Sequence, residues 1–202
     1  RDGQLVGRPV NQFVQLACFN KERLSSPPQT LEEMEQESEG STFGMALQLK
    51  DLFWSAESFD AGEAMEASLA QLPPDAERQA NVTSWLHWLK NASYQQNIRF
   101  LNDQRSLRDA LVAGDMDWIT CWSSSLRELR EKMDGKLALA PLPKGPSTKL
   151  KAATKLQVWS LGRNSSPQQR GKALVMIDFI TKPWAQKTYA LASRPAAFAA
   201  WL

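Results

Sequence analysis

One strand end in this sequence has the residue types to bind a polar ligand. Residues 116–122 (MDWITCW) form an apolar run typical of a strand, and the run ends at Trp122. Ser123 and two more serines follow directly, ahead of a helical pattern over residues 126–133. An indole face for stacking, hydroxyl donors and a helix N-terminus at one point are suited to a polar ligand.

Two further tryptophans, Trp54 and Trp159, could either contact a ligand or pack in the core. Trp54 ends a helical pattern over residues 49–54, immediately before a polar interruption at residues 55–62. Trp159 lies in the strand pattern of residues 155–161. Because an indole ring buries a large apolar area, core packing is the alternative for each tryptophan in the chain.

The sequence has few residues in the combinations that catalysis requires. His87 is the single histidine, and it lies on a helical pattern where we expect it to point toward solvent. A Ser-His-Asp triad or a zinc site therefore lacks its residues, and no carboxylate stands in a catalytic motif. We expect a protein that is not an enzyme and that carries no cofactor and no metal.

The two cysteines, Cys18 and Cys121, both lie in apolar, strand-like runs. Buried thiols behave as small hydrophobic side chains, and the geometry of a disulfide is demanding. We therefore expect two free buried thiols, with a bridge between them as the open alternative.

Charge and hydropathy limit the classes of partner. The 24 Lys and Arg residues nearly balance the 22 Asp and Glu residues, with both signs spread along the chain. Nucleic-acid binders concentrate basic residues on one face, so we expect no nucleic-acid partner. No apolar run approaches the roughly 20 residues that span a bilayer. The chain opens on Arg1 without a signal-peptide pattern, which we interpret as a mature or trimmed fragment.

The elements that must position these residues alternate between strands and helices. Strand patterns cover residues 13–19, 116–122, 136–143 and 155–161. Helical patterns begin at Leu31, with Thr30 as N-cap, and recur over residues 74–90, 106–113, 126–133, 168–180 and 184–191.

Two of these helices give specific expectations. The helix over residues 74–90 carries one apolar stripe at helical spacing, formed by Val82, Trp85, Leu86 and Leu89. For the helix over residues 106–113, we expect Ser106 as the N-cap and Gly114 as the left-handed residue that ends it.

Six short blocks, taken in chain order, resemble one family over nearly the whole chain. They are residues 3–9 (GQLVGRP), 16–21 (LACFNK), 27–33 (PPQTLEE), 111–116 (LVAGDM) with Trp122, 139–145 (LAPLPKG), and 159–166 (WSLGRNSS) with 173–180 (ALVMIDFI). This order resembles the extracellular, or periplasmic, solute-binding proteins of ABC importers, in the family that includes maltose-binding protein.

The resemblance implies an α/β fold, namely a periplasmic-binding-protein-like lobe with a mixed sheet flanked by helices and a remnant of the second lobe. It implies an interlobe crossing at residues 1–9, a C-terminal-lobe-like domain at residues 10–155 and a helical remnant of the N-terminal lobe at residues 156–202. Most of the N-terminal lobe is then expected to be missing from this chain.

The resemblance also implies a ligand-binding set, because family members bind solutes in the cleft between lobes. The residues carried over are Asn11, Phe13, Trp54, Trp122, Ser123, Trp159 and Arg194. Aromatic faces stack on sugar rings, and amide, hydroxyl and guanidinium groups pair with sugar hydroxyls. With eight Trp and two Tyr, the composition suits a carbohydrate better than a ferric ion. Trp122 and Trp159 are the best candidates, because strand ends face the cleft.

Partners and location follow from the same resemblance. We expect a small-molecule solute, an oligosaccharide or similar compound, and the membrane subunits of an ABC transporter as partners. We expect a periplasmic or extracellular location, with membrane anchoring through the missing N-terminus, and a second copy of the chain as one candidate cover for the incomplete lobe. The alternative function is a truncated, non-transport relative that acts as an interaction or sensor module.

Overall fold

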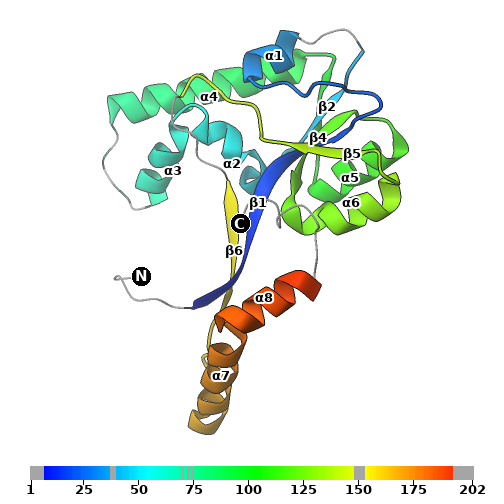
Figure 1. Ribbon diagram of the computed structural model, residues 1–202. Helices are drawn as coiled ribbons and strands as arrows, with labels where there is room; N and C mark the ends of the chain where they lie inside the picture. The colour runs from blue at the N-terminus through cyan, green and yellow to red at the C-terminus, as the bar shows by residue number, and fades with distance from the viewer. Residues whose placement is uncertain are drawn as a thin grey trace. The chain divides into compact units, whose positions relative to one another are not determined.

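The computed structural model describes residues 7–36, 40–69, 71, 73, 75–147 and 153–192 of the chain (Figure 1). Its strands are β1 (Arg8–Asn20), β2 (Phe43–Ala46), β3 (Ile98–Leu101), β4 (Trp118–Trp122), β5 (Leu137–Ala140) and β6 (Thr154–Trp159). Its helices are α1 (Leu31–Gln36), α2 (Leu49–Glu57), α3 (Ala61–Leu69), α4 (Ala76–Tyr94), α5 (Gln104–Ala113), the 3-10 turn η1 (Ser123–Ser125), α6 (Leu126–Met133), α7 (Pro167–Ile180) and α8 (Pro183–Ala192).

The chain divides into two compact units. The larger unit is Gln15–Ala153, and the smaller unit combines residues 1–14 with residues 154–202. The boundary therefore falls inside β1, whose first residues belong to the smaller unit. The predicted domain boundaries lie nearby, at residues 9 and 155, and the assignment of either unit to a lobe of the family stays a prediction.

The larger unit is built on a mixed sheet with the strand order β3-β2-β4-β1-β5. β2 runs parallel to β3 and β4, whereas β1 runs antiparallel to both β4 and β5. Figure 1 shows α2, α3 and α4 on one side of this sheet and α5 and α6 on the other. The predicted α/β class, with a mixed sheet flanked by helices, is confirmed.

Each face of the sheet buries its own apolar core. The side of α2 and α4 packs aromatic residues, among them Phe43, Trp54, Trp85, Trp88 and Trp118. The side of α5 and α6 packs aliphatic residues, among them Leu107, Leu111, Ile119, Leu126 and Leu129. Side chains alternate between the two faces along β4, so neighbouring residues of one strand belong to different cores. Both cores hold the strand ends in fixed positions.

Cys18 and Cys121 form a disulfide between the neighbouring strands β1 and β4. They are diagonal neighbours, two residues apart in the register, because Cys18 is opposite Ile119 and Cys121 is opposite Leu16. Their Cα atoms are 5.8 Å apart, within the usual range for a bridge. The expectation of two free thiols is therefore wrong. The pairing of β1 with β4 brings the two cysteines together although 103 residues of sequence separate them.

The helix expectations are confirmed in part. In α4, Trp85 is buried and His87 is exposed, as predicted, but Leu86 is 52% exposed and Trp88 takes the buried position. The predicted stripe of α4 was thus wrong at Leu86.

The start of α5 differs from the prediction, whereas its end agrees. Asp103, not Ser106, caps α5, and its carboxylate accepts a hydrogen bond from the Ser106 backbone N–H at 2.8 Å. An aspartate at the N-cap satisfies orphan N–H groups as well as a serine does, so the helix begins earlier. Gly114 ends the helix in the left-handed conformation, with a φ of 82°, as predicted.

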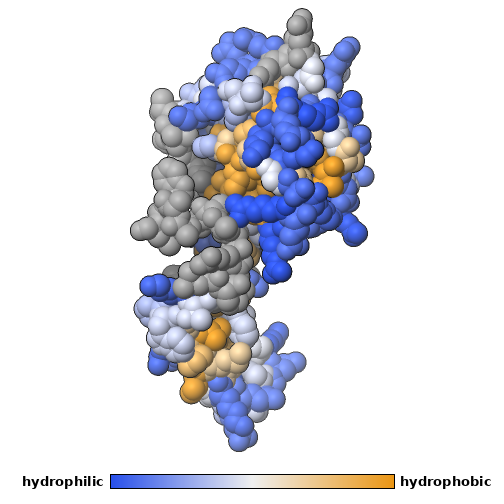
Figure 2. All heavy atoms as spheres, turned by 45° about the vertical axis from the view of Figure 1, so that its right-hand side comes forward, coloured by the Kyte–Doolittle hydropathy of each residue, from blue (hydrophilic) through white to orange (hydrophobic). Residues whose placement is uncertain are grey.

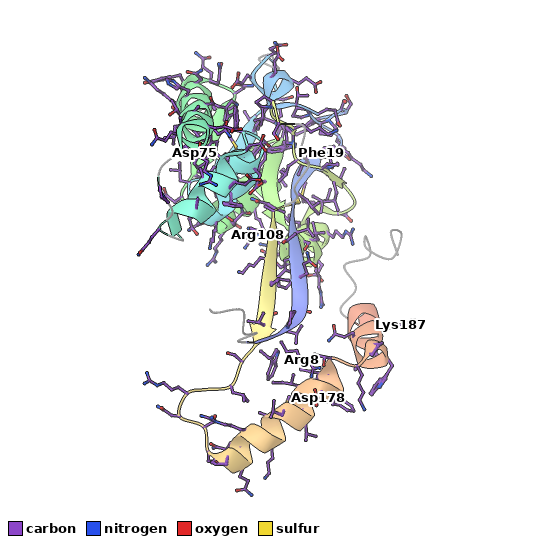
Figure 3. All side chains as sticks on the ribbon, turned by 90° about the vertical axis from the view of Figure 1, so that its left-hand side faces the viewer. Arg8, Phe19, Asp75, Arg108, Asp178 and Lys187 are labelled. Carbon is purple, nitrogen blue, oxygen red and sulfur yellow. A yellow bond between two sulfur atoms is a disulfide. The ribbon has the colours of Figure 1, made fainter. Side chains whose placement is uncertain are left out.

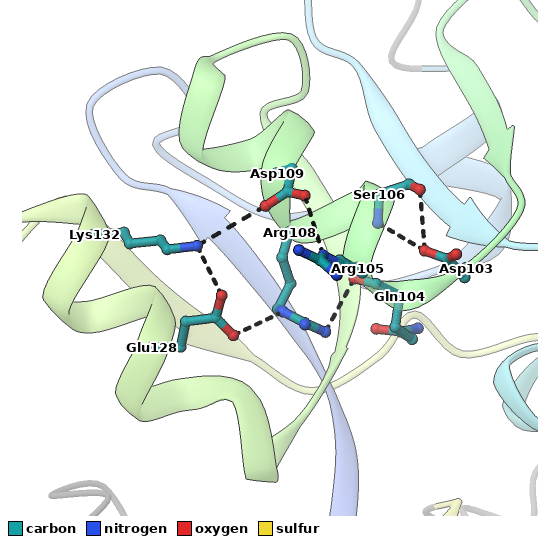
Figure 4. Close-up of polar contacts among 8 residues, drawn as sticks. All are labelled: Asp103, Gln104, Arg105, Ser106, Arg108, Asp109, Glu128 and Lys132. Carbon is teal, nitrogen blue, oxygen red and sulfur yellow. Dashed lines mark hydrogen bonds and ion pairs between the residues drawn. The ribbon is translucent and has the colours of Figure 1, made fainter.

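Charged side chains tie α5 to α6 on the surface (Figure 4). Glu128 of α6 accepts from Lys132 at 2.8 Å and lies 3.2 Å from the Nε of Arg108 on α5. The hydrogen bond from Lys132 lowers the pKa of the Glu128 carboxyl, and Arg108 adds to this effect. At the start of α5, Gln104 is held next to β4, because its Nε2 donates a hydrogen bond to the Oγ1 of Thr120 at 3.4 Å.

In the smaller unit, the first residues of β1 pair antiparallel with β6, with an irregular register between Pro9 and Asn11. α7 begins with a capping box of Ser166 and Gln169 and buries Ile177. Figure 3 shows Arg8 on β1 and Asp178 on α7 pointing toward each other, and the two form an ion pair.

The smaller unit exposes many apolar side chains (Figure 2). On its helices these are Leu174, Val175, Met176, Phe179 and Trp184. We call this set the α7–α8 apolar surface. Phe179 and Trp184 contact each other edge to face, with ring centroids 5.1 Å apart.

Candidate functional site

The candidate site lies where three parallel strands of the larger unit end. β2, β3 and β4 are parallel, so Ala46, Leu101 and Trp122 reach the same edge of the sheet. The loops after these strands lead into α2, α5 and η1 respectively. In open α/β sheets, ligands bind at this carboxyl edge. We call it the strand-end edge.

Trp122 occupies the end of β4 and is half-buried. Its indole Nε1 donates a hydrogen bond to the Oδ1 of Asp51 at 2.6 Å. Asp51 lies in the first turn of α2, is 0% exposed and therefore sits beneath the edge rather than on it. A carboxylate in the first turn of a helix is favoured by the helix dipole, which explains why α2 carries an acid here.

Gln15 joins this contact from β1. It is directly opposite Trp122 in the sheet register, and its side chain is buried. Its Nε2 donates to the backbone carbonyl of Asp51 at 2.7 Å. Three elements, β1, β4 and α2, thus meet in one hydrogen-bonded cluster of Gln15, Asp51 and Trp122, which we call the Asp51 cluster.

Polar atoms along the strand-end edge include acceptors that the protein leaves open. Three buried oxygens, Oδ2 of Asp51, Oε1 of Gln15 and Oε1 of Gln104, accept no hydrogen bond from the part of the chain that the structure describes. Buried acceptors of this kind normally find a donor, such as an ordered water. Ser123 is buried at the start of η1, directly after Trp122.

Apolar side chains flank the same edge. Leu47, in the loop after β2, and Leu49, the first residue of α2, are both more than half exposed. Together with the ring of Trp122, they give the strand-end edge apolar contact area next to its polar groups. A mixed surface of this kind is typical of a site for a polar ligand with apolar faces.

Trp54 belongs to the core. Its side chain is 3% exposed, and it packs edge to face on Trp88, with ring centroids 6.4 Å apart. Of the two interpretations of Trp54, this burial favours core packing over ligand contact. The polar interruption after Trp54 does not expose the ring, because α3 and α4 cover α2.

Three predicted residues of the smaller unit share one face of its strand pair. Asn11 is opposite Gln157, and its Nδ2 donates to the Oε1 of Gln157 at 2.8 Å. Phe13, two residues on, is half-buried opposite Lys155. Trp159, 42% exposed, follows Gln157 at the same two-residue spacing and so projects from the same face. Arg194 lies outside the described residues.

Sequence reasoning placed Trp122 and Ser123 at a strand end but missed Gln15 and Asp51. In the sequence, Asp51 looks like an ordinary acidic residue in the first turn of a helix, and Gln15 looks like a single polar residue inside a strand. Their roles depend on the pairing of β1 with β4 and on the packing of α2, neither of which is local in the sequence.

Other features of the described chain add no second site. A surface hollow lies in the loop between β1 and α1, lined by Ser26, Pro27, Pro28, Glu33 and Gln36. This loop follows Asn20, the last residue of β1, whereas Gln15 pairs with Trp122 earlier in the strand. Within the described ranges, no group of three or more His, Cys, Asp or Glu side chains is placed to hold a metal ion. No helix among these residues is both long and apolar enough to cross a membrane.

The family model of the bacterial extracellular solute-binding proteins matches residues 1–197. The chain belongs to this family. No curated protein matches it. The family is one of binding proteins rather than enzymes, and its name places its members outside the cytoplasm, which is the location that the sequence predicted. A disulfide between two buried cysteines is also typical of an oxidising, extracytoplasmic compartment.

Several solved structures share the fold. The maltose-bound MalE3 protein of T. maritima superposes with a TM-score of 0.68 at 17% sequence identity, over 94% of this chain and 54% of its own. The GacH receptor of Streptomyces glaucescens, solved unliganded and with acarbose, gives 0.74 at 11% identity, over 98% and 55%. UgpB from Mycobacterium tuberculosis, in complex with glycerophosphocholine, gives 0.68 at 15% identity, over 94% and 51%.

The sequence identities to these three structures lie between 11% and 17%. At such identities the similarities show the fold and not the ligand. This solute-binding chain spans about half the length of the structures it matches.

Proposed function

We propose that this chain is part of the solute-binding component of an ABC importer and that its solute is a carbohydrate. Membership of the solute-binding family supports the first part. The second part is supported by the Asp51 cluster, which holds an indole ring half-buried at the strand-end edge. Structures of the same fold were solved with maltose and with acarbose, which agrees with a sugar.

The chemistry of the strand-end edge suits a sugar ring. One face of a pyranose is lined by C–H groups that pack on an aromatic ring, whereas its hydroxyls both donate and accept hydrogen bonds. Trp122 supplies the ring, and Ser123 and Gln104 supply polar groups beside it. The single observation that carries the proposal is the position of Trp122 at the carboxyl edge of the sheet.

A thermal-shift and calorimetry panel of maltose, maltotriose, acarbose and glycerophosphocholine tests the proposal. A sugar at 100 times its dissociation constant should stabilise the folded chain by about 2.7 kcal/mol. Trp122→Ala should abolish this stabilisation, whereas Tyr94→Ala, at an exposed aromatic residue on α4, should leave it unchanged. If no sugar in the panel stabilises the chain at millimolar concentration, the carbohydrate proposal is refuted.

The partners and the anchoring belong to the same proposal. The membrane subunits of the transporter would receive the solute from this protein, and an anchor in the natural N-terminal region would keep it near the membrane. The alternative, an interaction or sensor module without a transport role, is not favoured by the family match. Sugar binding together with binding to transporter membrane subunits would favour transport, whereas sugar binding without that contact would favour the sensor.

A further inference from the structure

We propose that Asp51 is the positioning residue for the Trp122 ring and that it reserves the ring face, and not the indole N–H, for the ligand. This inference rests on the proposed function, because it specifies how the same site recognises a sugar. It assigns a role to a residue whose side chain is fully buried beneath the strand-end edge.

The hydrogen bond between the two side chains fixes which part of the indole is available. The indole has one polar group, its Nε1–H, which only donates. That group points to the Oδ1 of Asp51 at 2.6 Å, a short bond of the kind made to carboxylates. With the N–H occupied, Trp122 can offer a ligand only its C–H edge and its π face.

Asp51 is itself held firmly. It is 0% exposed, and its backbone N–H donates to the Gln48 carbonyl at 2.7 Å in the first turn of α2. The Gln15 side chain donates to the Asp51 carbonyl from β1. An indole anchored to such a fixed point loses little freedom when a ligand packs on it, so the ring is pre-organised for stacking.

The arrangement selects a class of ligand. A pyranose ring has a flat C–H face that covers an indole, whereas an open-chain polyol such as the glycerol part of glycerophosphocholine lacks one. Among the probes of the panel, we therefore expect maltotriose to depend strongly on the Asp51–Trp122 contact and glycerophosphocholine to depend on it weakly or not to bind.

The contact can be measured without any ligand. In a chain labelled with ¹⁵N-tryptophan, Trp122→Phe identifies the Trp122 indole N–H resonance. Asp51→Asn, an isosteric change, should shift that resonance and speed its exchange with water, while the other indole resonances stay in place. The matched control is Asp117→Asn, at a buried carboxylate near the start of β4 that pairs with Arg23, which should leave the Trp122 resonance unmoved.

Binding of maltotriose then tests the positioning role through a double-mutant cycle. Asp51→Asn keeps an amide oxygen as acceptor but removes its charge, and it should weaken binding about tenfold, the order of the difference between a hydrogen bond to a charged acceptor and one to a neutral acceptor. In a Trp122→Ala background, Asp51→Asn should cause no further loss, because the positioned ring is gone. The Asp117→Asn control should bind like the wild type.

Each outcome decides one claim. An Asp51→Asn loss that persists undiminished in the Trp122→Ala background would overturn the positioning role, because Asp51 would then act on the ligand or the fold directly. An unmoved Trp122 resonance in Asp51→Asn would overturn the contact itself. A wild-type chain that binds no sugar would refute the proposed function and the ligand class, while the resonance experiment still decides whether Asp51 holds the ring.

Discussion

The disulfide between β1 and β4 gives the sharpest test of the fold. Reducing it frees a loop of 103 residues in the unfolded chain. The chain-entropy relation for a loop of this length gives about 4.7 kcal/mol of stabilisation at 25 °C. Because both sulfurs are buried between the sheet and α5 and α6, reduction leaves the packing of the folded state nearly unchanged. We therefore expect most of this figure to be lost on reduction.

Urea unfolding, followed by the fluorescence of the buried tryptophans, measures the effect. With a slope of roughly 2 kcal/mol per molar, the midpoint should fall by about 2 M when protein reduced in denaturant is refolded with reductant present. The comparison uses one sequence, so no cavity from a substituted side chain contributes. A Cys18→Ala/Cys121→Ala variant should show the low midpoint with or without reductant. Equal midpoints for the oxidised and reduced wild type, or full alkylation of both thiols in the native unreduced protein, would refute the reasoning.

Three further predictions concern charge and exposed apolar surface. Glu128→Gln should cost at most about 1 kcal/mol at neutral pH, as expected for an exposed ion pair, and the difference from the wild type should vanish as pH falls from 4.5 through the lowered pKa of Glu128, as acid titration of stability would show. Burial raises the pKa of the Glu35 carboxyl, so the contribution of Glu35 to wild-type stability should fall as pH rises from 4.5 through that raised pKa; Glu35→Gln should raise the melting temperature at pH 7 and not at pH 4. The expectation that a second copy of the chain covers the α7–α8 apolar surface predicts that Phe179→Ser with Trp184→Ser converts a dimer into a monomer in light scattering; a monomeric wild type would contradict this expectation.

Local sequence patterns predicted many of the helices and strands, because helix caps and apolar strand runs depend on residues that are close together in the sequence. Gly114 ends α5 in the left-handed conformation, as a glycine after the last apolar turn indicates. The strand that ends at Trp122 is equally clear, since its apolar run stops at three serines. The start of α5 was misplaced because Asp103 and Ser106 are both good caps, and only the backbone conformation shows which one is used.

What the sequence could not supply is contact between distant segments. The sequence around α4 does not show that Trp88 is buried and Leu86 is exposed. That choice depends on the contacts of Trp88 with Trp54 and Phe59, which lie outside α4. The bridge of Cys18 likewise depends on β1 lying beside β4. The family resemblance gave Trp122 as a candidate residue but said nothing of Asp51, the buried acid that accepts a hydrogen bond from its indole ring.

β1 contributes candidate site residues to each of the two compact units. Its first residues pair with β6 in the smaller unit and carry Asn11 and Phe13. Its next residue in the larger unit is Gln15, which lies opposite Trp122 and holds Asp51. Three positions later, Cys18 ties the same strand covalently to β4. The bridge thus fixes the register that keeps Gln15 opposite Trp122, since a slip of one residue would turn the glutamine to the other face of the sheet. Stability and the geometry of the Asp51 cluster therefore depend on one structural feature, the pairing of β1 with β4.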